Sequence, residues 1–143
     1  MEKLKIIARL IALIFLWRGP QAQANAVVVV SAGSKVSTLT NDELGKIFLG
    51  KQRSIGGSNI VPADRKDSAI REYFHKNVTG KSLEVLKKYW ARKVFSGEDT
   101  PPVELESDNE VKEWLSKHPN GVSYMNEKNV DASVRIVRQI QQP

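Results

Sequence analysis

The sequence contains no cysteine and only two histidines among its 143 residues. Disulfide bridges and cysteine-ligated zinc are therefore excluded, and so is the lipid-modified cysteine that tethers many exported proteins. His75 and His118 share no i, i+4 spacing with each other or with a carboxylate cluster, so no metal site is expected. No Ser–His–Asp order and no nucleophile signature is present. Neither an enzyme nor a cofactor is indicated.

The sequence also lacks an apolar run long enough to span a bilayer, which takes about 20 residues. The run from Ile6 to Trp17 is shorter and is preceded by Lys3 and Lys5. With the small-x-small pattern Ala22-Gln23-Ala24, residues 1–24 are predicted to be a secretory signal peptide, with an uncleaved anchor as the alternative. The same pattern recurs two residues later, in Ala24-Asn25-Ala26, so cleavage after Ala26 also fits.

Positive charge is modest once the leader is removed. Half of the formal net charge of +6 lies in residues 1–24, and +3 remains on residues 25–143. That bias favours small anions but is too weak for a nucleic-acid surface, so no nucleic-acid partner is expected. An exported protein without a tether is retained only where a second membrane encloses it. We therefore expect a periplasmic protein, not embedded in the membrane after cleavage, with residues 25–143 forming one domain.

Strand and helix signals alternate along residues 25–143, which indicates an α/β layer fold. The β-branched run Val27 to Val30 predicts a strand buried on both faces, as in parallel sheets. Further strands are expected at 60–63, 122–125 and 134–137, and helices from Thr40 to Gly50, over 68–78, after Ser82 and after Ser107. Thr40 with Glu43, and Ser107 with Glu110, form capping boxes. Residues 51–59 and 98–105 are expected to be loops.

The strongest candidate site is the turn from the strand at 60–63 into the helix at 68–78. Ligands in open α/β sheets bind at this edge, and the first amides of a helix attract anions. The amides near Ser68, Ala69 and Ile70, the Ser68 hydroxyl and the Arg65 guanidinium are therefore candidates to bind a phosphate or similar oxyanion. Asp67 would repel a dianion unless it accepted a hydrogen bond from a protonated oxygen. The alternative is an ordinary capped helix with solvated cations.

Two other polar segments carry less weight. The loop at 31–35, which contains Ser31 and Ser34, follows a buried strand as phosphate-binding loops do, but it lacks the spacing of a P-loop. Ser31 and Ser34 are retained as lesser candidates for oxyanion contacts. Asp108 belongs to an acidic group that is expected to be the solvated start of a helix. The group consists of Glu104, Glu106, Asp108 and Glu110.

Four segments resemble, in order, the second lobe of periplasmic phosphate-binding proteins, the receptors of phosphate ABC transporters. They are LTNDELGKIFLGK at 39–51, VPADRKDS at 61–68, the aromatic segment from Tyr89-Trp90 to Phe95-Ser96-Gly97, and PNGVSY at 119–124. The resemblance covers nearly all of residues 25–143 but only one lobe of a two-lobed receptor. It implies a single three-layer domain, with a mixed sheet flanked by about four helices.

The resemblance also implies a ligand and partners. Arg65 and Ser68 match the family's phosphate-binding arginine and the first residue of its Ser-Gly-Thr helix start, whereas Ala69 and Ile70 replace the Gly-Thr pair. This implies binding of phosphate or another small oxyanion, linked to uptake through an ABC permease. A single lobe would leave the ligand half exposed, so a homodimer or another envelope protein would have to supply the second wall. The alternative is a protein-interaction or sensory module that keeps the lobe as a scaffold without a ligand.

Overall fold

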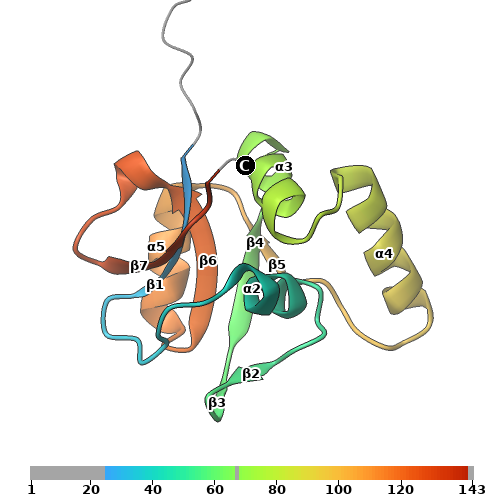
Figure 1. Cartoon of the computed structure of the whole chain (residues 1–143), viewed down its shortest axis with the longest axis horizontal. Helices are drawn as coiled ribbons and strands as arrows, with labels where there is room; N and C mark the ends of the chain where they lie inside the picture. The colour runs from blue at the N-terminus through green and yellow to red at the C-terminus, as the bar shows by residue number, and fades with distance from the viewer. Residues whose placement is uncertain (1–24, 67, 142–143) are drawn as a thin grey trace, which may run out of the picture.

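The computed structural model describes residues 25–66 and 68–141, and only the backbone of Ser68 (Figure 1). The predicted signal peptide lies outside these residues. A five-stranded sheet in the order β5–β4–β6–β1–β7 forms the centre. The strands are β1 (Ala26–Ser31), β4 (Val61–Arg65), β5 (Val103–Leu105), β6 (Gly121–Asn126) and β7 (Val134–Gln139). Because β4 runs parallel to β5 and β6 while β1 runs antiparallel to β6 and β7, the sheet is mixed, as expected.

Strand β1 is buried on both faces, as its valine run predicts. Val28, Val29 and Val30 are fully inaccessible to solvent. The expectation of parallel neighbours is wrong, because β1 pairs antiparallel on both sides. Its burial follows instead from helices that cover both faces of the sheet.

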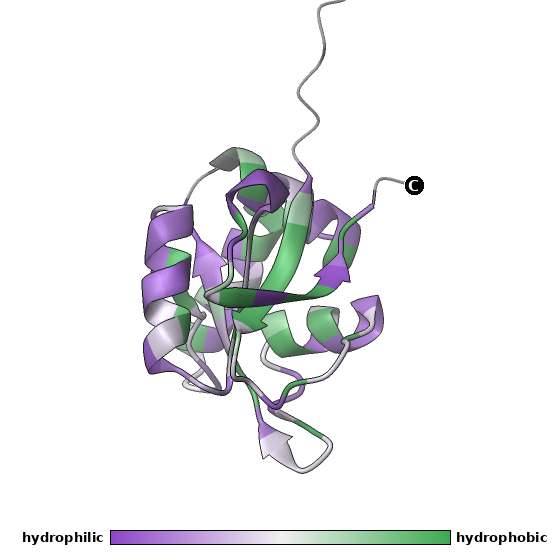
Figure 2. Cartoon of the chain, turned by 90° about the vertical axis from the view of Figure 1, so that its left-hand side faces the viewer, coloured by the Kyte–Doolittle hydropathy of each residue, from purple (hydrophilic) through white to green (hydrophobic). Residues whose placement is uncertain are grey.

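The helices form the outer layers of a three-layer domain. Helices α2 (Asn41–Phe48) and α3 (Ser68–Val78) cover one face, where Phe48 and Phe74 pack with Val28 and Tyr124. Helix α5 (Asp108–Lys117) covers the other face. Figure 2 shows hydrophobic residues concentrated in the central strands and hydrophilic residues on the outward faces of the helices.

Helix starts follow the capping signals in the sequence. The Thr40 hydroxyl accepts from the Glu43 amide at 3.2 Å, and the Glu43 carboxylate accepts from the Thr40 amide at 2.8 Å, which confirms this capping box. At α5 only half of the expected box forms. Ser107 accepts from the Glu110 amide, but Glu110 accepts from the amide of Glu106 instead.

Helix α4 (Leu83–Phe95) stands at the side of the domain, beyond the edge strand β5 (Figure 1). Leu86 and Trp90 pack against Leu49 at the end of α2. The Tyr89 hydroxyl also donates to the Leu49 carbonyl at 2.6 Å. One narrow stripe of α4 therefore holds it to the body, and its remaining surface faces solvent.

Two segments expected to be loops contain strands. β2 (Ser54–Ile55) and β3 (Ser58–Asn59) form a short hairpin, whose turn uses positive φ at Gly56 and Gly57. β5 lies within the segment 98–105 and pairs in parallel with β4. None of the helices within 25–66 and 68–141 is long and apolar enough to cross a bilayer.

Candidate functional site

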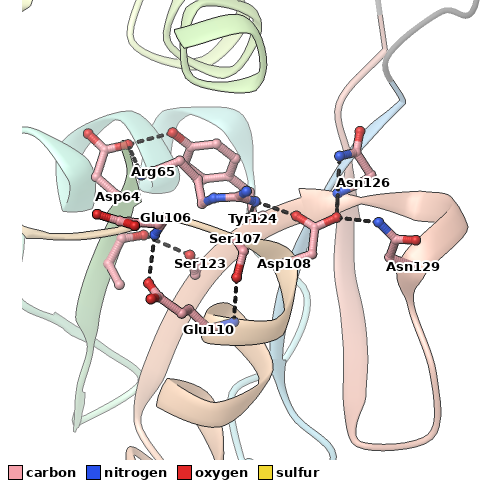
Figure 3. Close-up of polar contacts among 11 residues, drawn as sticks. Asp64, Arg65, Glu106, Ser107, Asp108, Glu110, Ser123, Tyr124, Asn126 and Asn129 are labelled. Carbon is pink, nitrogen blue, oxygen red and sulfur yellow. Dashed lines mark hydrogen bonds and ion pairs between the residues drawn. The ribbon is translucent and has the colours of Figure 1, made fainter. Parts of the chain in front are cut away.

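The last two residues of β4 carry the polar side chains of the candidate site. Successive side chains of a strand point to opposite faces of the sheet. Arg65 therefore reaches the side covered by α5, whereas Asp64 reaches the side covered by α3 (Figure 3). Both side chains are buried, with exposed fractions of 4% for Arg65 and 2% for Asp64.

Arg65 forms a buried ion pair with Asp108, the first residue of α5. Its Nη1 donates to Asp108 Oδ1 and, at 3.4 Å, to the carbonyl of Tyr124. Arg65 Nε is buried and has no hydrogen-bond partner among the described residues. Sequence reasoning identified Arg65 as a candidate ligand residue but did not anticipate this counterion.

Asp108 accepts most of the hydrogen bonds on the α5 side of the sheet at this site. Its Oδ2 accepts from Asn129 Nδ2 at 2.7 Å and from the backbone and side chain of Asn126 at 3.3 Å. Burial alone would raise the pKa of Asp108, but the hydrogen bond from Asn129 and the bond and charge of Arg65 outweigh it and lower the pKa. The expectation that Asp108 is solvated is wrong, because β4 and β6 bring these partners around it.

Asp64 accepts hydrogen bonds in the same way on the α3 side of the sheet. Its carboxylate accepts from the Tyr124 hydroxyl at 2.5 Å and lies 3.0 Å from His75 Nε2 and 3.3 Å from Arg71 Nε. Burial would raise the pKa of Asp64, but the bond and charge of His75 and the charge of Arg71 lower it. Burial, with the charge of Asp64, raises the pKa of Tyr124. Asp64 is therefore an ionised acceptor inside the protein.

A shallow pocket of about 390 Å³ lies beside the Arg65–Asp108 pair. Its lining is mostly amide and carboxylate side chains around the start of α5. The lining residues are Arg65, Glu106, Ser107, Asp108, Asn109, Asn126 and Asn129. Donors and acceptors thus surround one end of the Arg65 guanidinium, an arrangement suited to a small polar ligand that carries both oxygen acceptors and a proton.

The predicted residues Ala69 and Ile70 at the start of α3 are not among the residues that line this pocket. Helix α3 begins at Ser68, as predicted. Ala69 is exposed, whereas Ile70 packs into the core beneath the helix. The side chain of Ile70 is therefore not available to a ligand. Asp67 lies outside the described residues.

Ser31 and Ser34 lie at the opposite end of the sheet. β1 is antiparallel to β6, so Ala26 pairs with Asn126 beside the site, and Ser31 at the far end of β1 pairs with Val134. The Ser34 hydroxyl accepts from the Val36 amide within its own loop. The structure therefore does not bring these two serines to Arg65.

The three cations at the end of β4 and the start of α3 have carboxylate partners. Arg65 pairs with Asp108, and Lys66 pairs with Glu106 at 3.0 Å. Arg71 lies between Asp64 and Glu104, 3.0 Å from the latter. The positive charge of these three side chains is therefore already neutralised, and a ligand with a proton to donate suits the Arg65–Asp108 pair better than a fully ionised anion.

Three solved structures share the fold of this chain over part of their length. The chain superposes on a phosphate ABC transporter substrate-binding protein from Clostridium perfringens, described with bound phosphate, with a TM-score of 0.63 and 20% identity over 80% of this chain and 44% of that one. On an ABC-type phosphate transport receptor from Vibrio cholerae it superposes with a TM-score of 0.61 and 20% identity, over 80% of this chain and 45% of the receptor. On PstS from Borrelia burgdorferi it superposes with a TM-score of 0.58 and 18% identity, over 79% of this chain and 46% of PstS. The chain has the fold of one lobe of these receptors.

The predicted resemblance is thus confirmed at the level of the fold. The chain spans less than half the length of the receptors it matches. No protein-family model and no curated protein matches its sequence.

Within the domain, sequence reasoning missed the polar partners on β6 and after it. Asn126 and Asn129 gave no signal, because they occupy a strand end and a short 3-10 turn, η1 (Glu127–Asn129). His75 lies on α3 one turn before Thr79, to whose hydroxyl its Nδ1 lies at 3.2 Å. The one available signal for His75 was its place next to the apolar stripe of α3. That place indicates burial, and a buried histidine needs a polar partner.

Proposed function

We propose that this protein binds a small protonated oxyanion, phosphate in the first place, at the Arg65–Asp108 pair. The observation that carries the proposal is the buried Arg65 guanidinium, whose Nε has no partner among the described residues and which lines a pocket rich in amides. A guanidinium is the side chain best suited to bind an oxyanion through more than one hydrogen bond. The likeness in fold to a phosphate ABC transporter substrate-binding protein with bound phosphate and to an ABC-type phosphate transport receptor supports the same ligand.

The paired charges determine which oxyanion should bind. Phosphate at neutral pH still carries a proton, which it can donate to Asp108, whereas sulfate carries none. A fully ionised anion would place its oxygens against a carboxylate without a hydrogen bond, which is repulsive. Phosphate and arsenate should therefore bind better than sulfate. Binding should be weak, on the order of 1 mM or about −4 kcal/mol, because the pocket is open to water on one side.

Calorimetric titration with phosphate, arsenate and sulfate tests this proposal. Phosphate should bind at least roughly tenfold more tightly than sulfate, a difference of about 1.4 kcal/mol. Asn129→Ala and Arg65→Lys should weaken phosphate binding, whereas Arg53→Lys, at an exposed arginine that lines a different pocket, should leave it unchanged. Circular dichroism would show that each variant is folded. Absence of heat with every anion at tens of millimolar would refute the proposal.

A second candidate function is supported by the pairing of Arg65, Lys66 and Arg71 with carboxylates. In that case the Arg65–Asp108 pair is structural, and the lobe acts as a protein-interaction or sensory module without a ligand. The same titration separates the two candidates, because the module predicts no oxyanion binding. Delivery to an ABC permease would require both oxyanion binding and a second wall from a partner or a second copy.

We also propose export to the periplasm with cleavage after Ala24. Ala26 is buried and pairs with Asn126, and the Asn25 carbonyl accepts from the Glu127 amide at 2.9 Å. Cleavage after Ala24 keeps these contacts, whereas cleavage after Ala26 removes them. N-terminal sequencing of protein from a periplasmic extract should therefore begin at Asn25. A protein that begins at Val27 would contradict the choice of site, and one that retains Met1 would contradict cleavage.

A further inference from the structure

We propose that helix α4 docks this protein onto bilayers that carry anionic lipid headgroups. This inference does not depend on oxyanion binding, because α4 contributes no residue to the pocket at Arg65. It rests on where the positive charge of the chain lies, on an unusually exposed aromatic side chain, and on the position of the helix at the side of the domain.

Helix α4 carries the whole net charge of the domain. Its four cations, Lys87, Lys88, Arg92 and Lys93, stand against the single acid Glu84, a net charge of +3. Residues 25–143 together also have a net charge of +3, so the remainder of the domain is neutral. A concentrated basic surface on an otherwise neutral domain orients it toward a negatively charged surface.

The cations on α4 are also less fully paired than Arg65, Lys66 and Arg71 at the candidate site, although Lys93 is near enough to Asp99 to help lower the pKa of that carboxyl group. Lys87, Arg92 and Lys93 have no carboxylate within ion-pair distance in the described part of the chain. Lys88 pairs with Glu84 at 3.2 Å, but both side chains are more than three-quarters exposed, so the pair adds little. Lys93 instead lies over the ring of Tyr89, 5.3 Å from its centroid.

An exposed aromatic ring ends the same helix. The exposed fraction of Phe95 is 95%, and that of its neighbour Val94 is 52%. Lys88 and Arg92 precede Phe95 by seven and three positions, so helical periodicity places all three on one face. That face is opposite the stripe of Leu86 and Trp90 that packs on the body. An apolar ring beside cations whose stems can lie along acyl chains is the pattern of interfacial membrane binding.

Two features favour a bilayer over other occupants. A second copy would bring two helices of charge +3 together, which is repulsive. The outward face of α4 is a protruding helix surface at the side of the domain (Figure 1), and a flat, deformable headgroup layer can accommodate it without a matching groove. Each cation near an anionic membrane surface strengthens binding by about fivefold, and the Phe95 ring adds an apolar contribution.

Vesicle sedimentation with the exported, processed protein tests the proposal. We expect partition onto phosphatidylcholine vesicles that contain about 30% phosphatidylglycerol, little partition onto pure phosphatidylcholine, and release at about 0.5 M salt. Lys88→Gln with Arg92→Gln should reduce partition by roughly twentyfold, and Phe95→Ser by roughly tenfold.

Matched variants elsewhere on the domain provide the controls. The double variant Lys117→Gln with Lys128→Gln lowers the net charge by the same amount as the α4 double variant, but on α5 and η1. Val61→Ser removes an exposed apolar side chain outside α4. These variants should partition like the wild type. Equal losses in the control and α4 variants would refute a specific role for α4. Absence of partition onto anionic vesicles at low salt would overturn the proposal, and it is the result expected if α4 binds an acidic protein instead.

Discussion

Replacing Asp64 with alanine is expected to destabilise the fold by about 3–5 kcal/mol, the usual cost of removing one partner from a buried charged network. Two side-chain donors and one nearby charge meet this carboxylate: the Tyr124 hydroxyl at 2.5 Å, His75 Nε2 at 3.0 Å, and the Arg71 guanidinium, whose Nε lies at ion-pair distance of 3.3 Å. Without Asp64, the Tyr124 hydroxyl and the His75 ring would remain buried with no acceptor in its place. Denaturant unfolding followed by circular dichroism measures the loss.

Two further variants determine whether the network is the cause. Asp64→Asn keeps an acceptor oxygen and should cost less than Asp64→Ala. Asp42→Ala removes a carboxylate whose only ion pair among the described residues, with Lys46, is on the surface, and should change the free energy of unfolding by less than about 0.5 kcal/mol. A cost for Asp64→Ala similar to that for Asp42→Ala would show that the buried network does not stabilise the fold.

Features set by neighbouring residues could be predicted from the sequence. The capping box at Thr40 and Glu43 uses residues three positions apart, and both of its hydrogen bonds form. The apolar stripe of α3 and the valine run of β1 predicted burial correctly, because an apolar stripe indicates one covered face and a continuous apolar run indicates two. The family resemblance of LTNDELGKIFLGK indicated the lobe, and the solved structures confirm that fold.

Features set by distant residues could not be predicted in this way. β5 is three residues long and follows Pro101-Pro102, and only its parallel pairing with β4 makes it a strand. Asp108 looked like an exposed residue at the start of a helix, because its partners Arg65 and Asn126 lie 43 and 18 positions away. Local sequence also contained no sign that Ser31 and Arg65 would lie at opposite ends of the sheet.

The placement of Arg65 changes what its presence in the sequence implies. An arginine at the end of a strand beside a helix start is consistent with a free anion clamp, but in the structure part of its guanidinium is already used by Asp108. The same residue therefore contributes to the fold and, in our proposal, to ligand binding. A loss of binding in an Arg65 variant is informative only if its structural contribution is measured separately.

A double-mutant cycle on Arg65 and Asp108 measures that structural contribution. Arg65→Met and Asp108→Asn should each cost about 3 kcal/mol at neutral pH, because each leaves a buried charge without its counterion. The double variant should cost well below the sum of the two, which gives a coupling energy of about 2 kcal/mol or more. Arg53 and Asp99 form a control pair whose arginine side chain is 70% exposed, and their coupling should stay below about 1 kcal/mol.

Acid should abolish the coupling between Arg65 and Asp108. The pKa of Asp108 is lowered in the folded protein from an ordinary value of 3.8, so the unfolded chain takes up the proton first as the pH falls. The stability that the ionised carboxylate contributes is therefore complete above about pH 4 and is lost as the pH falls through the folded pKa. Urea unfolding at pH 7, 5, 4 and 3 should show the wild type converging on Asp108→Asn. A gap between the two proteins that stays constant down to pH 3 would mean that the carboxylate charge is not what stabilises the pair.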